Sequence, residues 1–304
     1  MKILLFMAIF MVPLLILGMF GNLNLIYATW KFKDLQNRNS LLVAIIAVSE
    51  MHEWKKAIEI ILNRAAMKRV NCYRSIFLYC YSFNMANVAI LFLAIDRFIA
   101  IRSPIKYRTM RTTPFIVLAV SIGFLYSTAI VIAGFIVVDE QLIEPCEQTL
   151  AYSPRLMTAW NCTSVSIAFA VFILNVIDYY LLRNAGKQRE LYESDDAAYS
   201  RQNQLTNSML ITMVADCSTS LLSSFVLFIV NLLPVSTETI ANISAVLCFL
   251  LLFNYGNNYY ILFWRCRAYR TKFLAVLQAM HCNEKVGVTE KITTVTKTYK
   301  WFHQ

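Results

Sequence analysis

Apolar residues occur along this chain in runs of about 20, the length with which an α-helix crosses the hydrocarbon core of a bilayer. Short stretches rich in polar and charged residues separate the runs. The pattern predicts an all-α membrane protein, a seven-transmembrane helix bundle over residues 1–264. Its expected spans are residues 4–29, 40–62, 74–101, 114–138, 156–182, 204–233 and 238–264.

The second run has the weakest apolar pattern. It is cleanly apolar only from Leu41 to Ser49, and its later half carries charged or titratable side chains. These are Glu50, His52, Glu53, Lys55, Lys56 and Glu59. Because such groups are costly against lipid, we expect this half to face the bundle interior or to lie above the hydrocarbon.

The first run follows Lys2, a pattern that a secretory signal peptide shares. Its apolar stretch is longer than the usual apolar region of a signal peptide, and no clear small-x-small cleavage site interrupts it. We therefore predict a first transmembrane helix.

After the last run, residues 265–282 place apolar side chains at helical spacing among basic ones. The apolar positions are Tyr269, Phe273, Val276, Leu277 and Met280. The spacing predicts a short amphipathic helix on the inner leaflet, in contact with membrane lipid. Cys266 and Cys282 are lipidation candidates beside it, with a free thiol as the alternative. Residues 283–304 are expected to form a flexible cytoplasmic tail.

Composition supports a membrane protein. The chain has 304 residues, of which 58% are hydrophobic and only 15% are charged, too few to solvate a globular surface of this size. A net charge of +10 is typical of nucleic-acid binding in a soluble protein, but here the bases lie between apolar runs. Anionic lipid headgroups are therefore the expected partner, and nucleic acid is not.

The distribution of bases predicts the orientation. With the N-terminus outside, the seven-span arrangement puts 20 of the 28 Lys and Arg residues on the cytoplasmic side. The positive-inside rule favours this arrangement. We expect a multi-pass protein of the plasma membrane with its C-terminus in the cytoplasm.

Two of the eight cysteines have a distinctive position. Cys72 lies at the outer start of the third run, and Cys146 lies in the loop after the fourth run, on the same side of the membrane. That side is oxidising, so we predict a bridge between them. Two free thiols are the alternative, and Cys162 competes for the same partner.

Several short motifs occur in a fixed order along the chain. They are "GN" at Gly21, "HE" at His52, Cys72 placed 25 residues before Arg97, "DRFIAIRSPIKYR" from Asp96 and "NYGNNYYILFWRCRAYR" from Asn254. In this order they resemble the rhodopsin-like G-protein-coupled receptors, and most closely the nematode serpentine chemoreceptors of class Sx. The resemblance implies a receptor that binds an external small molecule or peptide and activates a heterotrimeric G protein.

The resemblance also implies a switch at the cytoplasmic end of the third helix. Arg97 is expected to be held by Asp96 at rest and released on activation, with Pro104 and Tyr107 in the following loop belonging to the same site. An ordinary interfacial salt bridge is the alternative explanation of the Asp-Arg pair.

A polar core between helices is expected from Asn22, Glu50, Asn254, Asn257 and Asn258. The chain departs from typical rhodopsin-like receptors here. It lacks the Cys-Trp-x-Pro motif in the sixth run and Asn-Pro-x-x-Tyr in the seventh, and Glu50 stands where a sodium-binding Asp is usual. Activation schemes built on those motifs do not transfer.

Candidate pocket residues are Glu53, Tyr79, Ser82 and Phe83. Tyr79 precedes Arg97 by five helical turns on about the same helix face. Receptors for amines need an acid near this position, so Tyr79 argues against an amine ligand. Ordinary packing of the bundle is the alternative explanation of these aromatic side chains.

Enzymatic function is not indicated. In "HEWKK" Lys56 stands where a second zinc-binding His is required, and no Gly-rich phosphate loop is present. We expect no catalytic residue, no cofactor and no metal. A transporter or channel is the alternative function, with Asp216 as a candidate in an ion path and Asp178 more simply explained by an interfacial position.

Overall fold

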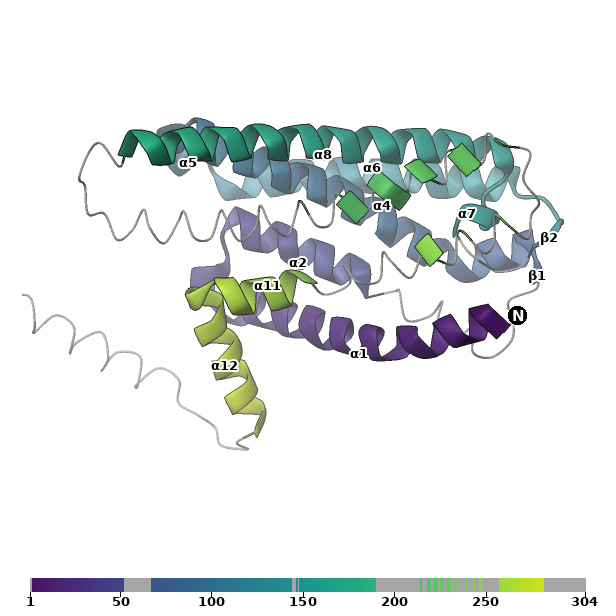
Figure 1. The fold of residues 1–304 in the computed structure, drawn as a ribbon, viewed down its shortest axis with the longest axis horizontal. Helices are drawn as coiled ribbons and strands as arrows, with labels where there is room; N and C mark the ends of the chain where they lie inside the picture. Colours follow the sequence, from purple (N-terminus) through teal and green to yellow (C-terminus); the bar gives the residue numbers. More distant parts are fainter. Residues whose placement is uncertain are drawn as a thin grey trace, which may run out of the picture.

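The computed structural model describes residues 2–51, 67–143, 146, 148–189 and 257–281, with isolated positions between 214 and 247. Nearly all of this part is helical (Figure 1). The long helices are α1 (Lys2–Lys31), α2 (Arg38–Glu50), α4 (Arg69–Arg102), α6 (Thr112–Val137), α8 (Pro154–Arg189) and α12 (Arg267–His281). The shorter elements are η1 (Lys33–Leu35), β1 (Met67–Lys68), α5 (Pro104–Thr109), β2 (Leu142–Ile143), α7 (Gln148–Ala151) and α11 (Asn257–Arg265).

Four of the described helices are long and apolar enough to cross a bilayer. They are Met11–Lys31, Arg69–Arg102, Thr112–Val137 and Pro154–Asn184. They match the first, third, fourth and fifth predicted runs, which confirms a helical membrane bundle. The described part of α2 has only 13 residues, and the sixth and seventh runs lie largely outside the described residues. Seven crossings therefore remain a prediction.

The α4 helix begins five residues before the predicted start of the third run. Its first residue, Arg69, is buried because it donates hydrogen bonds to the carbonyl oxygen of Leu150 and to the carboxylate of Asp139. The backbone N–H of Arg69 also donates to Gln141. These contacts with the loop that follows α6 allow α4 to begin at a charged residue, before the apolar run starts.

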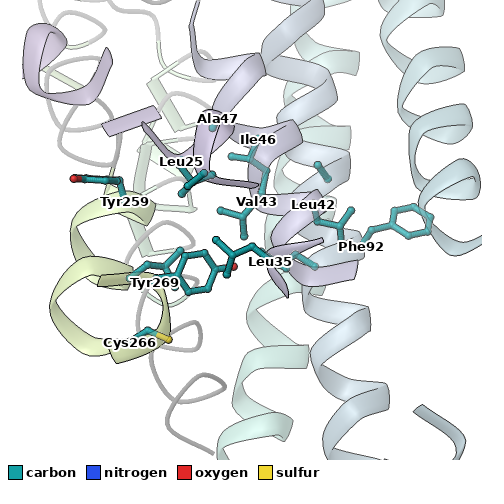
Figure 2. Packing of buried hydrophobic residues seen from close by; sticks show 14 of the residues in the cluster. Leu25, Leu35, Leu42, Val43, Ile46, Ala47, Phe92, Tyr259, Cys266 and Tyr269 are labelled. Atoms are coloured by element: carbon teal, nitrogen blue, oxygen red, sulfur yellow. The ribbon is translucent and has the colours of Figure 1, made fainter. Parts of the chain in front are cut away.

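The core of the bundle lies where α4 packs against α2, α6 and α8. On the other side of α2, α1 packs against α11 and α12. Figure 2 shows the shared cluster, in which Leu25 of α1 lies beside Val43 of α2 and Tyr269 extends from α12 toward Leu35. A Cβ at Gly21 would lie 3.1 Å from the Cβ of Tyr259, so the glycine allows α1 and α11 to approach closely.

The amphipathic helix is present as α12, but its apolar face is covered by protein. Tyr269, Phe273 and Val276 are buried in the cluster shared with α1 and α2. The Phe273 ring lies 4.5 Å from the ring of Tyr259, and the Tyr269 hydroxyl makes a hydrogen bond with Ser40. The prediction that this face rests on the inner leaflet is therefore wrong for these residues, because the spacing shows which side is apolar and not what covers it.

Cys266 lies between α11 and α12 and is only 3% exposed (Figure 2). A thiol packed in the core is not accessible to an acyl donor, and this burial argues against lipidation of Cys266 in the folded chain. Cys282, the second candidate, lies outside the described residues.

The bundle has two distinct ends (Figure 1). The start of α1 lies at one end with β1, β2 and α7, and we call this the disulfide end because it contains Cys72 and Cys146. The opposite end carries α5 and α12 and the last turn of α4. We call it the arginine end, after Arg38 and Arg97.

Candidate functional site

The arginine end holds a buried ion pair in the last turns of α4. Arg97 is 3% exposed and Asp96 is 0% exposed. The Arg97 Nη2 donates to Asp96 Oδ2 over 2.5 Å. Asp96 and Arg97, which the motif singles out, are thus in direct contact inside the protein and not at its surface.

Arg38 is the third member of this site, and sequence reasoning missed it. It is 4% exposed, and its Nε lies 3.3 Å from Asp96 Oδ1. Its Nη2 donates to the carbonyl oxygen of Tyr107 over 3.0 Å, and its guanidinium stacks 4.0 Å from the centre of the Tyr107 ring. In the sequence Arg38 is one of the 20 bases on the predicted cytoplasmic side, and no local motif distinguishes it from the others.

A capped helix start positions Arg38. The side chain of Asn37 accepts a hydrogen bond from the backbone N–H of Ser40, which begins α2 at Arg38. The first turn of α2 packs against the end of α4, so this cap places the guanidinium beside Asp96.

Tyr107 connects the two charges. Its hydroxyl donates to Asp96 Oδ2 over 3.0 Å and accepts from Arg97 Nη2 over 3.0 Å. Burial raises the pKa of Tyr107 above its ordinary value, while the Arg97 guanidinium opposes this shift. The hydroxyl therefore keeps its proton at neutral pH and can donate and accept at once. Pro104 begins α5, the short helix that carries Tyr107.

Part of the predicted polar core is assembled between α1 and α2. The Asn22 Nδ2 donates to Glu50 Oε2 over 2.9 Å. Asn257 and Asn258 lie in the first turn of α11, which packs against α1, and Asn258 is buried. Asn254 lies outside the described residues. Two members of the predicted polar core, Asn22 and Glu50, are thus in direct contact.

The predicted bridge joins Cys72 to Cys146, with 5.5 Å between the Cα atoms. Its competitor, Cys162, is a free and exposed thiol. The bridge ties the start of α4 to the loop before α7 and lies in a cluster with Tyr73, Tyr152 and Trp160. The β1–β2 pair, with Met67 opposite Ile143, holds the same loop a second time.

The pocket candidates of α4 follow Cys72 along the helix, and two of them, Tyr79 and Phe83, pack against this cluster. The Tyr79 ring lies 6.2 Å from that of Phe83, which in turn lies 6.0 Å from the ring of Trp160. Trp160 also donates through Nε1 to Asn84 Oδ1 over 2.9 Å, a contact that the sequence did not predict. Ser82 is buried. Because these rings pack on one another, a role in ligand binding stays a prediction.

Glu53 and the rest of the "HEWKK" segment lie outside the described residues, as does Asp216. Asp178 is described, and the interfacial position expected for it stays a prediction. It is 0% exposed in α8, since the helix turns this residue toward the bundle.

A comparison with protein families decides the class of the chain. The sequence model of the family described as "Serpentine type 7TM GPCR chemoreceptor Srsx" matches residues 15–277. The chain belongs to this Srsx family. No curated protein matches it.

Membership in the Srsx family makes the chain a chemoreceptor of the G-protein-coupled class and a multi-pass membrane protein. The resemblance read from its motifs is thereby confirmed. The family is not a class of enzymes. The match spans α2, α4 and α5, and so includes every residue of the Arg38, Asp96, Arg97 and Tyr107 cluster.

Proposed function

We propose that this Srsx chemoreceptor binds an external cue toward its disulfide end and activates a heterotrimeric G protein at its arginine end. The observation that supports this most is the buried cluster of Arg38, Asp96, Arg97 and Tyr107. A structural helix end needs no such cluster, because charged side chains at a membrane boundary can extend into water at little cost.

The cluster has the properties of a two-state switch. Removing two arginines and one carboxylate from water costs several kcal/mol per ion unless each finds partners. An arrangement in which every buried charge has a partner is therefore clearly lower in free energy than one in which a charge lacks a partner. A ligand need only favour one arrangement of the helices to change the partner of Arg97.

The bundle is proposed to cross the plasma membrane seven times with its N-terminus outside. In this orientation the disulfide forms in an oxidising compartment, and the arginine end faces the anionic inner leaflet. The described bases at that end include Lys31, Lys33, Arg102, Arg111, Arg183, Arg265 and Arg270.

The cue is proposed to be a small molecule or peptide that is not a biogenic amine. Tyr79, Ser82 and Phe83 of α4 lie between the disulfide and the arginine end, with Glu53 as a further candidate. Their side chains offer aromatic surface and hydroxyl groups, and none of the three carries the negative charge that an ammonium group requires.

The proposal is tested by ligand-independent activation of G protein in cells, at matched surface expression. Asp96→Asn keeps the shape of the side chain but removes the charge that holds Arg97. We expect basal activation to rise several-fold, the scale of about 1 kcal/mol in the balance of two states.

Arg97→Ala should lower activation below that of the parent receptor, because the group that is released is then missing. Arg102→Ala is the matched control, since Arg102 is an exposed base in the last turn of the same helix. Full activation by the Arg97 variant contradicts the proposal. Ion currents that persist without any G-protein activation favour a channel instead.

A further inference from the structure

Of the polar side chains that α8 buries in the described structure, Asn175 and Asp178 are the most deeply buried, and the proposed switch uses neither. Asn175 and Asp178 lie one turn apart on one face of the helix and are 1% and 0% exposed. Neither the amide of Asn175 nor either carboxylate oxygen of Asp178 finds a hydrogen-bond partner within the described part of the chain. Buried polar groups in a membrane-spanning helix are expensive, so an unpaired carboxylate here needs an explanation.

The charges around Asp96 provide one. Arg38, Arg97 and Asp96 are all nearly fully buried, and together they carry one excess positive charge. In its ionised form Asp178 supplies one negative charge, and with this charge the described group of four is neutral. Neutrality matters here because an uncompensated charge is far more costly inside a protein than at its surface.

Arg97 is also the charged residue placed to interact with Asp178. The guanidinium of Arg97 acts on the Asp178 carboxylate electrostatically, and α4 packs directly against α8. The Nη2 of Arg97 is engaged with Asp96 and Tyr107, while its Nε has no hydrogen-bond partner. Arg97 Nε and both carboxylate oxygens of Asp178 thus lack hydrogen-bond partners within the described part of the chain, on two helices that pack against each other.

We propose that Asp178 is the second carboxylate partner of Arg97, which receives its guanidinium when Arg97 leaves Asp96. In the structure two arginines share Asp96, and Asp178 has no hydrogen-bond partner among the described residues. After the exchange, Arg38 remains with Asp96, and Arg97 pairs with Asp178. Each carboxylate then has one arginine, and no charge leaves the protein interior. The meaning of this exchange for signalling rests on the proposed function, but the pairing itself can be tested separately.

The test of the pairing is a double-mutant cycle on the purified full-length receptor, measured as its apparent Tm in detergent. Asp178→Asn is compared in the parent and in the Asp96→Asn background. In the parent, Arg97 keeps Asp96, so we expect a small change. In the Asp96→Asn background, Asp178 is the described acid that remains to interact with Arg97, so the loss of Tm should be larger by about 3 °C or more.

Two controls separate this result from general disruption of α8. Asn175→Ala, an equally buried but uncharged position on the same face, should give the same loss in both backgrounds. Asp178→Glu keeps the charge and should retain the Tm of the Asp96→Asn receptor. If the Asp96 and Asp178 double variant does not fold, Arg97→Gln provides another route, since Asp178→Asn should then no longer cost stability.

Equal losses of Tm in the parent and in the Asp96→Asn background overturn the pairing. In signalling, Asp178→Asn should reduce the raised basal activation of Asp96→Asn at least several-fold, and an unchanged level also overturns it. Failure of Asp96→Asn to raise basal activation is a different result. It contradicts the proposed switch, while the Tm cycle still decides whether Arg97 and Asp178 form a pair.

Discussion

The two ends of this receptor are stabilised by different kinds of interaction. At the disulfide end, a covalent bond, a two-stranded pairing and a cluster of aromatic rings hold one loop against α4. At the arginine end, the contacts among α2, α4 and α5 depend on charged side chains that share partners. The first arrangement has one stable state, whereas the second can exchange partners without breaking a covalent bond.

The largest expected effect comes from opening the disulfide. Cys72→Ser or Cys146→Ser should cost about 2–5 kcal/mol of stability, because the loop is then held only by the short strands and by packing. We expect reduced surface expression and a lower apparent Tm. Cys162→Ser is the control, since this exposed thiol is free and should be neutral. Normal surface levels of both bridge variants would show that the end is not held by the bridge.

At the arginine end, Arg38→Gln should have the next largest effect. It removes the charge beside Asp96, the hydrogen bond to the Tyr107 carbonyl and the stacking on its ring, together about 2 kcal/mol. Because Arg38 no longer stabilises Asp96 after Arg97 leaves, G-protein activation should fall. Lys33→Gln, an exposed base in η1, is the control for general loss of positive charge. Activation equal to that of the parent would exclude Arg38 from the switch.

A smaller effect is expected for Tyr107→Phe. The ring and its stacking on Arg38 remain, but the hydroxyl that joins Asp96 to Arg97 is lost, which costs about 1 kcal/mol. Basal activation should rise moderately, less than with Asp96→Asn. Tyr126→Phe, which loses an exposed hydrogen bond to Thr163, is a control at a distance from the switch. A fall in basal activation instead of a rise would mean that the hydroxyl favours the active state.

The smallest effect should follow from breaking a charge pair at the disulfide end. Lys68 Nζ lies 3.0 Å from Glu140 Oε2, but both side chains are exposed. Exposed pairs contribute about 0–1 kcal/mol, so Lys68→Ala should leave the apparent Tm and surface expression almost unchanged. A large loss of apparent Tm would show that an exposed charge pair can stabilise the protein as much as the buried pairs at the arginine end.

The features that could be predicted from the sequence are those that depend on neighbouring residues or on the order of the helices. The lengths of apolar runs predicted the helices, because a crossing helix is a local property of 20 or so residues. Cys72 and Cys146 could be paired because the expected topology left few alternatives. Tyr107 was found because it follows Asp96 closely in a known motif.

Contacts between distant segments could not be predicted in the same way. Arg38 and Trp160 owe their roles to partners on other helices, and nothing in their neighbouring residues records this. The same holds for Asp178, whose burial depends on how α8 is turned. For α12, helical spacing predicted the helix, whereas only the structure shows that its apolar face packs against α1 and α2.

The contact between α4 and α6 has a mechanical consequence. Tyr73 follows Cys72 directly, and its hydroxyl occupies the space that a side chain at Gly134 would fill, where it donates to the carbonyl oxygen of Val131. The bridge and this close packing of Tyr73 against Gly134 therefore fix α4 at one point. The helix continues without interruption to Arg97, a lever arm of about 36 Å. A tilt of about 5° around the fixed point displaces Arg97 by about 3 Å, the length of one hydrogen bond.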